Sequence, residues 1–207
     1  MTLPKNHLLL VTAILACTAC NAQKAVTNTE NTSTTTATNT TENTTTNTAA
    51  ANAGDPVQSA MSAAPPSIAA DATIVTASAD GSMKTIRDGK NGWTCMPDSP
   101  ATPGPDPMCM DANAAKWAAA WIGHKPPPAN TVGLMYMLEG GTDASNSDPY
   151  ATAPTADNDW VKTGPHVMVV GSQELLKGYP AGAKPDTKSP YVMWAGTPYA
   201  HLMVPVG

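Results

Sequence analysis

The feature that most limits the fold of this chain is a stretch of threonine and asparagine near its start. Between Ala25 and Thr48, thirteen of the 24 residues are Thr and five are Asn, with no large apolar residue beyond Val26. Such a stretch buries too little apolar surface to offset the entropy lost on ordering it. We therefore expect residues 17–70 to form a disordered tether and residues 71–207 to form a single folded domain.

An apolar run precedes the tether. Residues 8–16 (LLLVTAILA) follow Lys5, and the run ends directly before Cys17. A helix that spans a bilayer needs about 20 such residues, whereas the apolar part of a secretory signal peptide has about 7 to 15. The sequence therefore predicts a signal peptide at residues 1–16 and export of the remaining chain.

The end of this run, Ile14-Leu15-Ala16-Cys17, resembles the lipobox of bacterial lipoproteins. The resemblance implies that the Cys17 thiol is the lipid attachment site and that acyl chains anchor the protein to a membrane of the bacterial cell envelope, facing the periplasm or the exterior. Cys20, which follows Ala19, is the alternative attachment site. An ordinary secretory cleavage near Ala22, without a lipid, is a further alternative.

Two cysteines lie in the expected domain. An oxidising compartment favours a disulfide between Cys95 and Cys109. Thirteen residues separate the two cysteines, which is not the C-x-x-C spacing of a redox pair. In the chain-entropy model, a disulfide that closes a loop of about 15 residues contributes roughly 3 kcal/mol to stability.

Short apolar or alternating segments dominate the expected domain. The predicted strands are residues 73–77, 83–87, 92–96, 131–138, 166–171, 191–194 and 199–206. The turn sequences Asp80-Gly81 and Asn91-Gly92 separate the first three strands, which we expect to form an antiparallel meander.

One clear helix is predicted at residues 112–122. Asp111 is a typical N-cap, and Gly123 ends the helical pattern. Trp117 and Trp121 are four residues apart and share one helix face. The fold class is therefore α+β: an antiparallel sheet of short strands with one packed helix.

Charge and motifs exclude several functions. With 11 basic and 16 acidic residues, the formal net charge is −5, which does not favour nucleic acid. The sequence contains no G-x-S-x-G, H-E-x-x-H, P-loop or G-x-G-x-x-G motif. Ser145, Asp143 and Asp148 leave a hydrolytic site open, but the pattern favours a binding or structural module without catalytic residues. We expect its exposed aromatic residues to form a contact patch: Trp160, Tyr191 and Trp194.

Two segments carry a wider resemblance. Residues 92–111 and the stretch GGTDASNSDPYAT at 140–152 resemble a group of secreted bacterial proteins with no assigned function. This resemblance implies no activity, substrate or partner.

The strongest chemical signal is a repeated motif, His166-Val167-Met168 and His201-Leu202-Met203. On a strand, residues i and i+2 point to the same side, about 6–7 Å apart. Imidazole with thioether is a ligand set that suits copper, above all Cu(I). The motif resembles the H-x-M ending of the periplasmic copper chaperone family, although the upstream His and Met of that family are not matched here.

We therefore expect one of two roles for these side chains. Either His166, Met168, His201 and Met203 face one side of the sheet and together bind copper, or the methionines fill gaps in a core without Phe. Imidazole must be neutral to bind a metal, so copper binding is expected to weaken below about pH 6.5.

Overall fold

The computed structural model describes residues 54–78 and 82–207. The predicted signal peptide, both candidate lipid attachment cysteines and the Thr/Asn stretch lie outside the described residues. The helices are α1 (Pro56–Ser62), α2 (Pro66–Ala69), α3 (Ala112–Ile122) and the short 3-10 helix η2 (Gln173–Leu176). The strands are β1 (Thr73–Ala77), β2 (Met83–Arg87), β3 (Thr94–Met96), β4 (Met108–Met110), β5 (Gly133–Met137), β6 (Ala144–Ser145), β7 (Trp160–Val161), β8 (His166–Val170), β9 (Tyr191–Met193) and β10 (His201–Pro205).

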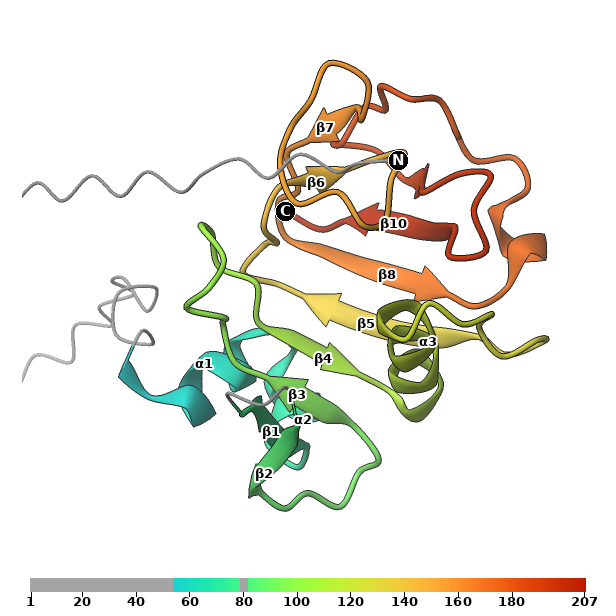
Figure 1. The fold of residues 1–207 in the computed structure, drawn as a ribbon. Coiled ribbons are helices and arrows are strands. Elements are labelled where there is room, and N and C mark those ends of the chain that lie inside the picture. Colours follow the sequence, from blue (N-terminus) through green and yellow to red (C-terminus); the bar gives the residue numbers. More distant parts are fainter. Residues whose placement is uncertain (1–53, 79–81) are drawn as a thin grey trace, which may run out of the picture. The chain divides into compact units, whose positions relative to one another are not determined.

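Eight strands form one sheet in the order β2-β1-β3-β4-β5-β8-β10-β9 (Figure 1). All neighbouring pairs are antiparallel except β1 and β3, which are parallel. Strands β6 and β7 pair separately, within the long loop between β5 and β8. The predicted α+β class is confirmed, with a mixed sheet in place of a purely antiparallel one.

The predicted meander of the first three strands is wrong at its third strand. β3 pairs with β1 and not with β2, so the chain after β2 passes the start of β1 to reach its other side. Gly89 makes this crossing: a Cβ there would lie 2.1 Å from the Thr73 backbone nitrogen. Because no side chain fits at that distance, the short connection depends on glycine at this position.

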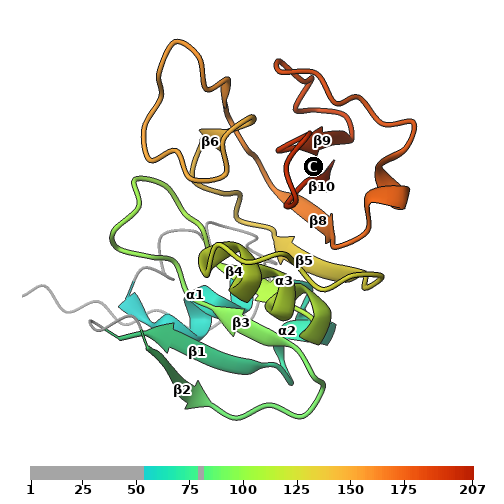
Figure 2. The same cartoon turned by 45° about the vertical axis from the view of Figure 1, so that its right-hand side comes forward.

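The predicted start of the domain at residue 71 is also wrong, because two further helices, α1 and α2, precede it. α1 and α2 lie on the face of the sheet opposite α3 (Figure 2). In α1 and directly after it, Ala60 and Ala63 are fully buried, in one cluster with Cys95 and Cys109. Asp55 caps α1 through the Val57 N–H. This alanine- and proline-rich segment folds because the sheet supplies the apolar surface that its small side chains cannot supply alone.

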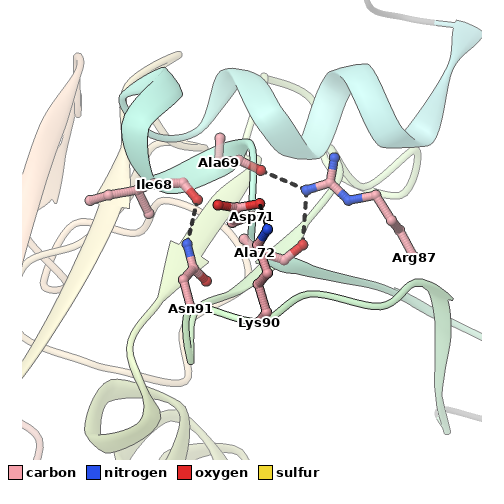
Figure 3. Close-up of polar contacts among 7 residues, drawn as sticks. All are labelled: Ile68, Ala69, Asp71, Ala72, Arg87, Lys90 and Asn91. Carbon is pink, nitrogen blue, oxygen red and sulfur yellow. Dashed lines mark hydrogen bonds and ion pairs between the residues drawn. The ribbon is translucent and has the colours of Figure 1, made fainter.

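Polar contacts fasten the end of α2 to the sheet (Figure 3). The Arg87 guanidinium donates to the carbonyl oxygens of Ala69 at 2.6 Å and Ala72 at 2.8 Å. Asn91 donates to the Ile68 carbonyl at 2.8 Å. These bonds add side-chain donors to backbone carbonyls at and just after the end of the short helix. Residues 54–70 are therefore an integral part of the domain.

The predicted helix at 112–122 is confirmed as α3. The Asp111 carboxylate accepts hydrogen bonds from the Asn113 and Ala114 N–H groups, at 3.0 and 2.7 Å. Trp117 is 2 % exposed and points into the core between α3 and the sheet. Among the described residues, no helix combines the length and apolar character needed to cross a bilayer.

The predicted disulfide is confirmed. Cys95 on β3 and Cys109 on β4 face each other across an antiparallel pair, with their Cα atoms 4.0 Å apart. Both residues are fully buried beneath α1. The bridge therefore joins two neighbouring strands at the point where α1 packs on them.

Candidate functional site

The two H-x-M motifs face the same side of the sheet. β8 and β10 are antiparallel neighbours, and Met168 stands directly opposite Met203. Residues two positions apart on a strand point to the same side. His166 and His201 therefore share the face of the two methionines. This is the face covered by α3, and both histidines are buried, at 4 % and 1 % exposure.

Methionines form a large part of the wall around these histidines. A cavity of about 250 Å³ lies between α3 and the sheet, lined mainly by apolar side chains. Eight of the eleven methionines of the chain line it, which includes every one after Met83. They are Met96, Met108, Met110, Met135, Met137, Met168, Met193 and Met203. We call this the methionine cavity.

The strand register arranges part of this wall as a row. Met110, Met135, Met168 and Met203 stand opposite one another on β4, β5, β8 and β10, and Tyr191 on β9 completes the row. The two histidines lie on opposite sides of the row. His166 is two residues before Met168, and His201 is two residues before Met203 on the antiparallel strand.

This register separates the two histidines. His166 stands opposite Pro205, which is four residues from His201 along β10. Four residues of strand span roughly 13 Å of backbone. One metal ion with bonds of about 2 Å could therefore bind both rings only if each ring pointed straight along its strand toward the other. The structure thus places the four predicted ligands on one face, but in two groups and not at one point.

Each group consists of a histidine and two methionines. His201 has Met203 two residues along its own strand and Met193 directly opposite on β9. His166 has Met168 two residues along its own strand and Met137 directly opposite on β5. Side chains opposite each other in an antiparallel pair have Cβ atoms about 4.5–5.5 Å apart. Both imidazoles therefore lie among thioether groups.

The hydrogen bonds of the rings fix which nitrogen is available. Nδ1 of His201 is 3.0 Å from the Tyr199 carbonyl oxygen, and Nδ1 of His166 is 2.6 Å from the Gly164 carbonyl oxygen. A carbonyl only accepts, so each Nδ1 carries the proton and each Nε2 has a free lone pair. Metal-binding histidines commonly show this arrangement, with the second ring nitrogen donating to a carbonyl.

Burial keeps both rings neutral. It lowers the pKa of His201 to about 4 and also lowers the pKa of His166. The backbone carbonyls at Nδ1 oppose these shifts without reversing them. Neutral imidazole is the form that binds metal ions.

His201 Nε2 is buried and has no hydrogen-bond partner. Trp117 and Trp194 pack edge-on against this ring, with centroid distances of 5.4 and 4.8 Å. Trp117 Nε1 and the Tyr191 hydroxyl are also buried and unpartnered, and burial raises the pKa of Tyr191 to about 12. Two of these unpaired groups, His201 Nε2 and Trp117 Nε1, belong to residues that line the methionine cavity. This is unusual, because buried polar groups in native proteins normally have a protein, water or ion partner.

The predicted contact patch is wrong for two of its three residues. Tyr191 and Trp194 are 2 % and 7 % exposed and belong to the core. The indole N–H of Trp194 donates to the Ser145 carbonyl at 2.9 Å. Trp160 is half-buried on β7. The aromatic residues of β9 and its end pack inward because they continue the face that carries the histidines.

Ser145 has a structural role. Its hydroxyl donates to the Asn158 carbonyl and accepts from the N–H groups of Ser147 and Asp148, at 3.2 and 2.8 Å. These bonds hold the β6–β7 loop in shape. Neither cavity histidine is hydrogen bonded to Ser145, since each Nδ1 is bonded to a backbone carbonyl.

The sequence assigned four of the cavity residues as candidate copper ligands and did not assign the other methionines to the site. Met135 and Met137 alternate on a strand with apolar residues, so their face could not be identified as the ligand face from sequence alone. Met96, Met108 and Met110 flank the disulfide and gave no separate signal. The usable signal was the absence of Phe combined with the concentration of methionine after residue 83.

Comparisons with known proteins add no further constraint. No protein-family model matches the chain, and neither a curated protein nor a solved structure is significantly similar to it. The functional argument therefore rests on the methionine cavity and its two histidines.

Proposed function

We propose that this protein binds copper(I) in the methionine cavity, with His201 Nε2, Met193 and Met203 as ligands. The observation that carries the proposal is the buried lone pair of His201 Nε2, which has no partner in a cavity walled by thioethers. An unsatisfied buried polar group costs about 1–3 kcal/mol. A bond to a metal ion removes that cost and uses the ring nitrogen that the Tyr199 carbonyl leaves free.

The donor set favours a soft metal ion. Thioether and imidazole suit Cu(I), whereas Mg²⁺, Ca²⁺ and Mn²⁺ prefer oxygen ligands. Among the described residues, no group of three or more His, Cys, Asp or Glu side chains is placed to hold a metal ion. Asp106 is the one acidic residue at the cavity wall, and its carboxylate accepts hydrogen bonds from Ser99 and Thr102.

The setting of this activity is also proposed. The apolar run before Cys17 supports export and acylation at Cys17 or Cys20, so the copper site would be held in the bacterial cell envelope. The chain would then act as a lipid-anchored binding protein for copper.

The test is an anaerobic titration of the full chain in detergent with Cu(I), in competition with a chromogenic Cu(I) chelator. We expect Met193→Leu with Met203→Leu to weaken binding at least about 100-fold. Removing a residue that only supports a ligand weakens metal binding by up to about 100-fold, and these two methionines are proposed as ligands themselves. Leucine conserves volume, so the fold is retained at a cost below about 1.5 kcal/mol per site. Met83→Leu, at an exposed methionine away from the cavity, is the matched control. Equal Cu(I) affinity in the wild type, the double variant and the Met83→Leu control would contradict the proposal.

A second candidate is a small apolar molecule. The cavity volume of about 250 Å³ and its apolar wall favour such a ligand, since dry apolar cavities of about 150 Å³ bind benzene. The same leucine variants separate the two candidates. They retain an apolar cavity and would still bind an apolar molecule, whereas they lose the thioethers that a copper ion needs.

A further inference from the structure

We infer a second copper(I) position in the methionine cavity, formed by His166, Met168 and Met137. This inference rests on the proposed function, because it assumes that the cavity binds copper at all. It assigns a separate ion to His166, which is not among the ligands of the position at His201.

The second group repeats the first. In each H-x-M motif the methionine lies two residues after the histidine, on the same side of its strand. In each case a further methionine stands directly opposite the histidine: Met193 opposite His201, and Met137 opposite His166. The chain therefore builds the same ligand set twice, on either side of the Met168–Met203 pair.

Gly141 shows that the His166 and Met137 side chains meet. A Cβ at Gly141 would lie 3.3 Å from His166 Cε1 and 3.5 Å from Met137 Cε. Cε1 of the His166 ring, which lies between the two ring nitrogens, and the terminal methyl group of Met137 are both close to this point. In the described part of the chain, His166 Nε2 makes no hydrogen bond, while Nδ1 is held by the Gly164 carbonyl. Nε2 of His166 is thus free to bind a metal ion.

The second position lies at the outer end of the cavity. A surface cleft of about 940 Å³ is lined by residues 139–143 and 162–165, among others. Gly141, Thr142 and Thr163 line both this cleft and the methionine cavity. His166 follows directly after the cleft residues, whereas His201 is enclosed by Trp117 and Trp194. An ion at His166 therefore exchanges with the cleft more readily than an ion at His201.

The row of methionines connects the two positions. Met168 belongs to the outer group and Met203 to the inner group, and the two residues are directly opposite each other on β8 and β10. A copper ion that moves between the histidines can therefore exchange one thioether for the next. Copper then enters from the cleft, binds first at His166 and moves on to His201.

The experiment measures how many Cu(I) ions the full chain binds and how fast a chelator removes them. The wild-type chain is expected to bind two ions and release them in a fast and a slow phase. Met137→Leu with Met168→Leu should bind one ion and lose the fast phase. Met193→Leu with Met203→Leu should bind one ion and lose the slow phase. Met83→Leu should behave as the wild type.

The outcomes separate the two proposals. A single ion in the wild type that both double variants lose would show one shared site, which overturns the second position but keeps copper binding. Two ions retained after Met137→Leu with Met168→Leu would place the second ion elsewhere and also overturn the inference. No bound ion in the wild type would overturn the proposed function itself.

Discussion

Burial is the main cause that keeps the two cavity histidines neutral, and the proximity of His166 lowers the pKa of His201 further. Their Nδ1 atoms donate to backbone carbonyls, and no carboxylate is among their hydrogen-bond partners. Because burial lowers the pKa of His201 to about 4, protons compete with a metal ion at this ring only in more acidic solution than the value of about 6.5 expected from the sequence.

This burial predicts an acid-sensitive fold for the metal-free protein. Between pH 6.5 and about 4, His201 binds a proton in the unfolded state and not in the folded state. The free energy of unfolding therefore falls as pH decreases through this window and is fully restored above pH 6.5. One pKa unit corresponds to about 1.4 kcal/mol, so His201 contributes a loss of about 3 kcal/mol.

Urea unfolding at pH 7 and pH 4.5 measures this loss. His201→Gln should reduce the difference between the two pH values, with the remaining part due to His166, whereas His124→Gln, at the exposed end of the helix, should leave it unchanged. An equal pH dependence in the wild type and in His201→Gln would contradict the burial argument.

The disulfide between Cys95 and Cys109 also contributes to the stability of the fold. Removing it through Cys95→Ala with Cys109→Ala should lower the free energy of unfolding by about 2–5 kcal/mol, because the reduced chain gains freedom in the unfolded state. Chemical denaturation with matched reduced and oxidised samples is the measurement. A change below about 1 kcal/mol would show that the strand pairing and α1 hold this region without the bridge.

At the scale of elements, the sequence predicted what short-range patterns encode. α3 was recognised from Asp111, Gly123 and the tryptophans, and its bounds are those expected. β8 and β10 were recognised with their shared ligand face, because alternation fixes the side of a strand. These features depend on residues only a few positions apart.

Features that depend on distant partners were missed. The segment that holds α1 and α2 has small side chains and is buried by packing against residues far along the chain, which include Cys95 and Cys109. The parallel β1–β3 pair depends on the close passage of Gly89. The separation of His166 from His201 follows from the register in which β8 and β10 pair. The two short motifs do not determine that register.

Deleting α1 and α2 tests their place in the domain. A chain that starts at residue 71 should be less stable than one that starts at residue 54, by about 3 kcal/mol or more. Four buried alanine methyl groups would be lost, each worth about 0.8 kcal/mol: Ala60, Ala63, Ala64 and Ala69. Thermal and urea unfolding of the two chains give the comparison. Equal stability would show that these helices add nothing to the fold.

At the scale of the whole molecule, the proposed function combines a membrane anchor with a copper site. If the lipobox acts as its sequence suggests, Cys17→Ser with Cys20→Ser should release the protein from membranes and abolish labelling by a fatty-acid analogue. Each single variant then identifies the acylated cysteine. A double variant that remains in the detergent fraction and still takes the label would contradict the anchor.

The most direct measurement is X-ray absorption at the copper edge on the full chain loaded with one equivalent of Cu(I). The account predicts a first shell that contains both thioether sulfur and imidazole nitrogen. It further predicts that the sulfur contribution declines in Met193→Leu with Met203→Leu and not in Met83→Leu. A shell of nitrogen and oxygen alone, or a sulfur contribution unchanged by these substitutions, would contradict copper binding in the methionine cavity.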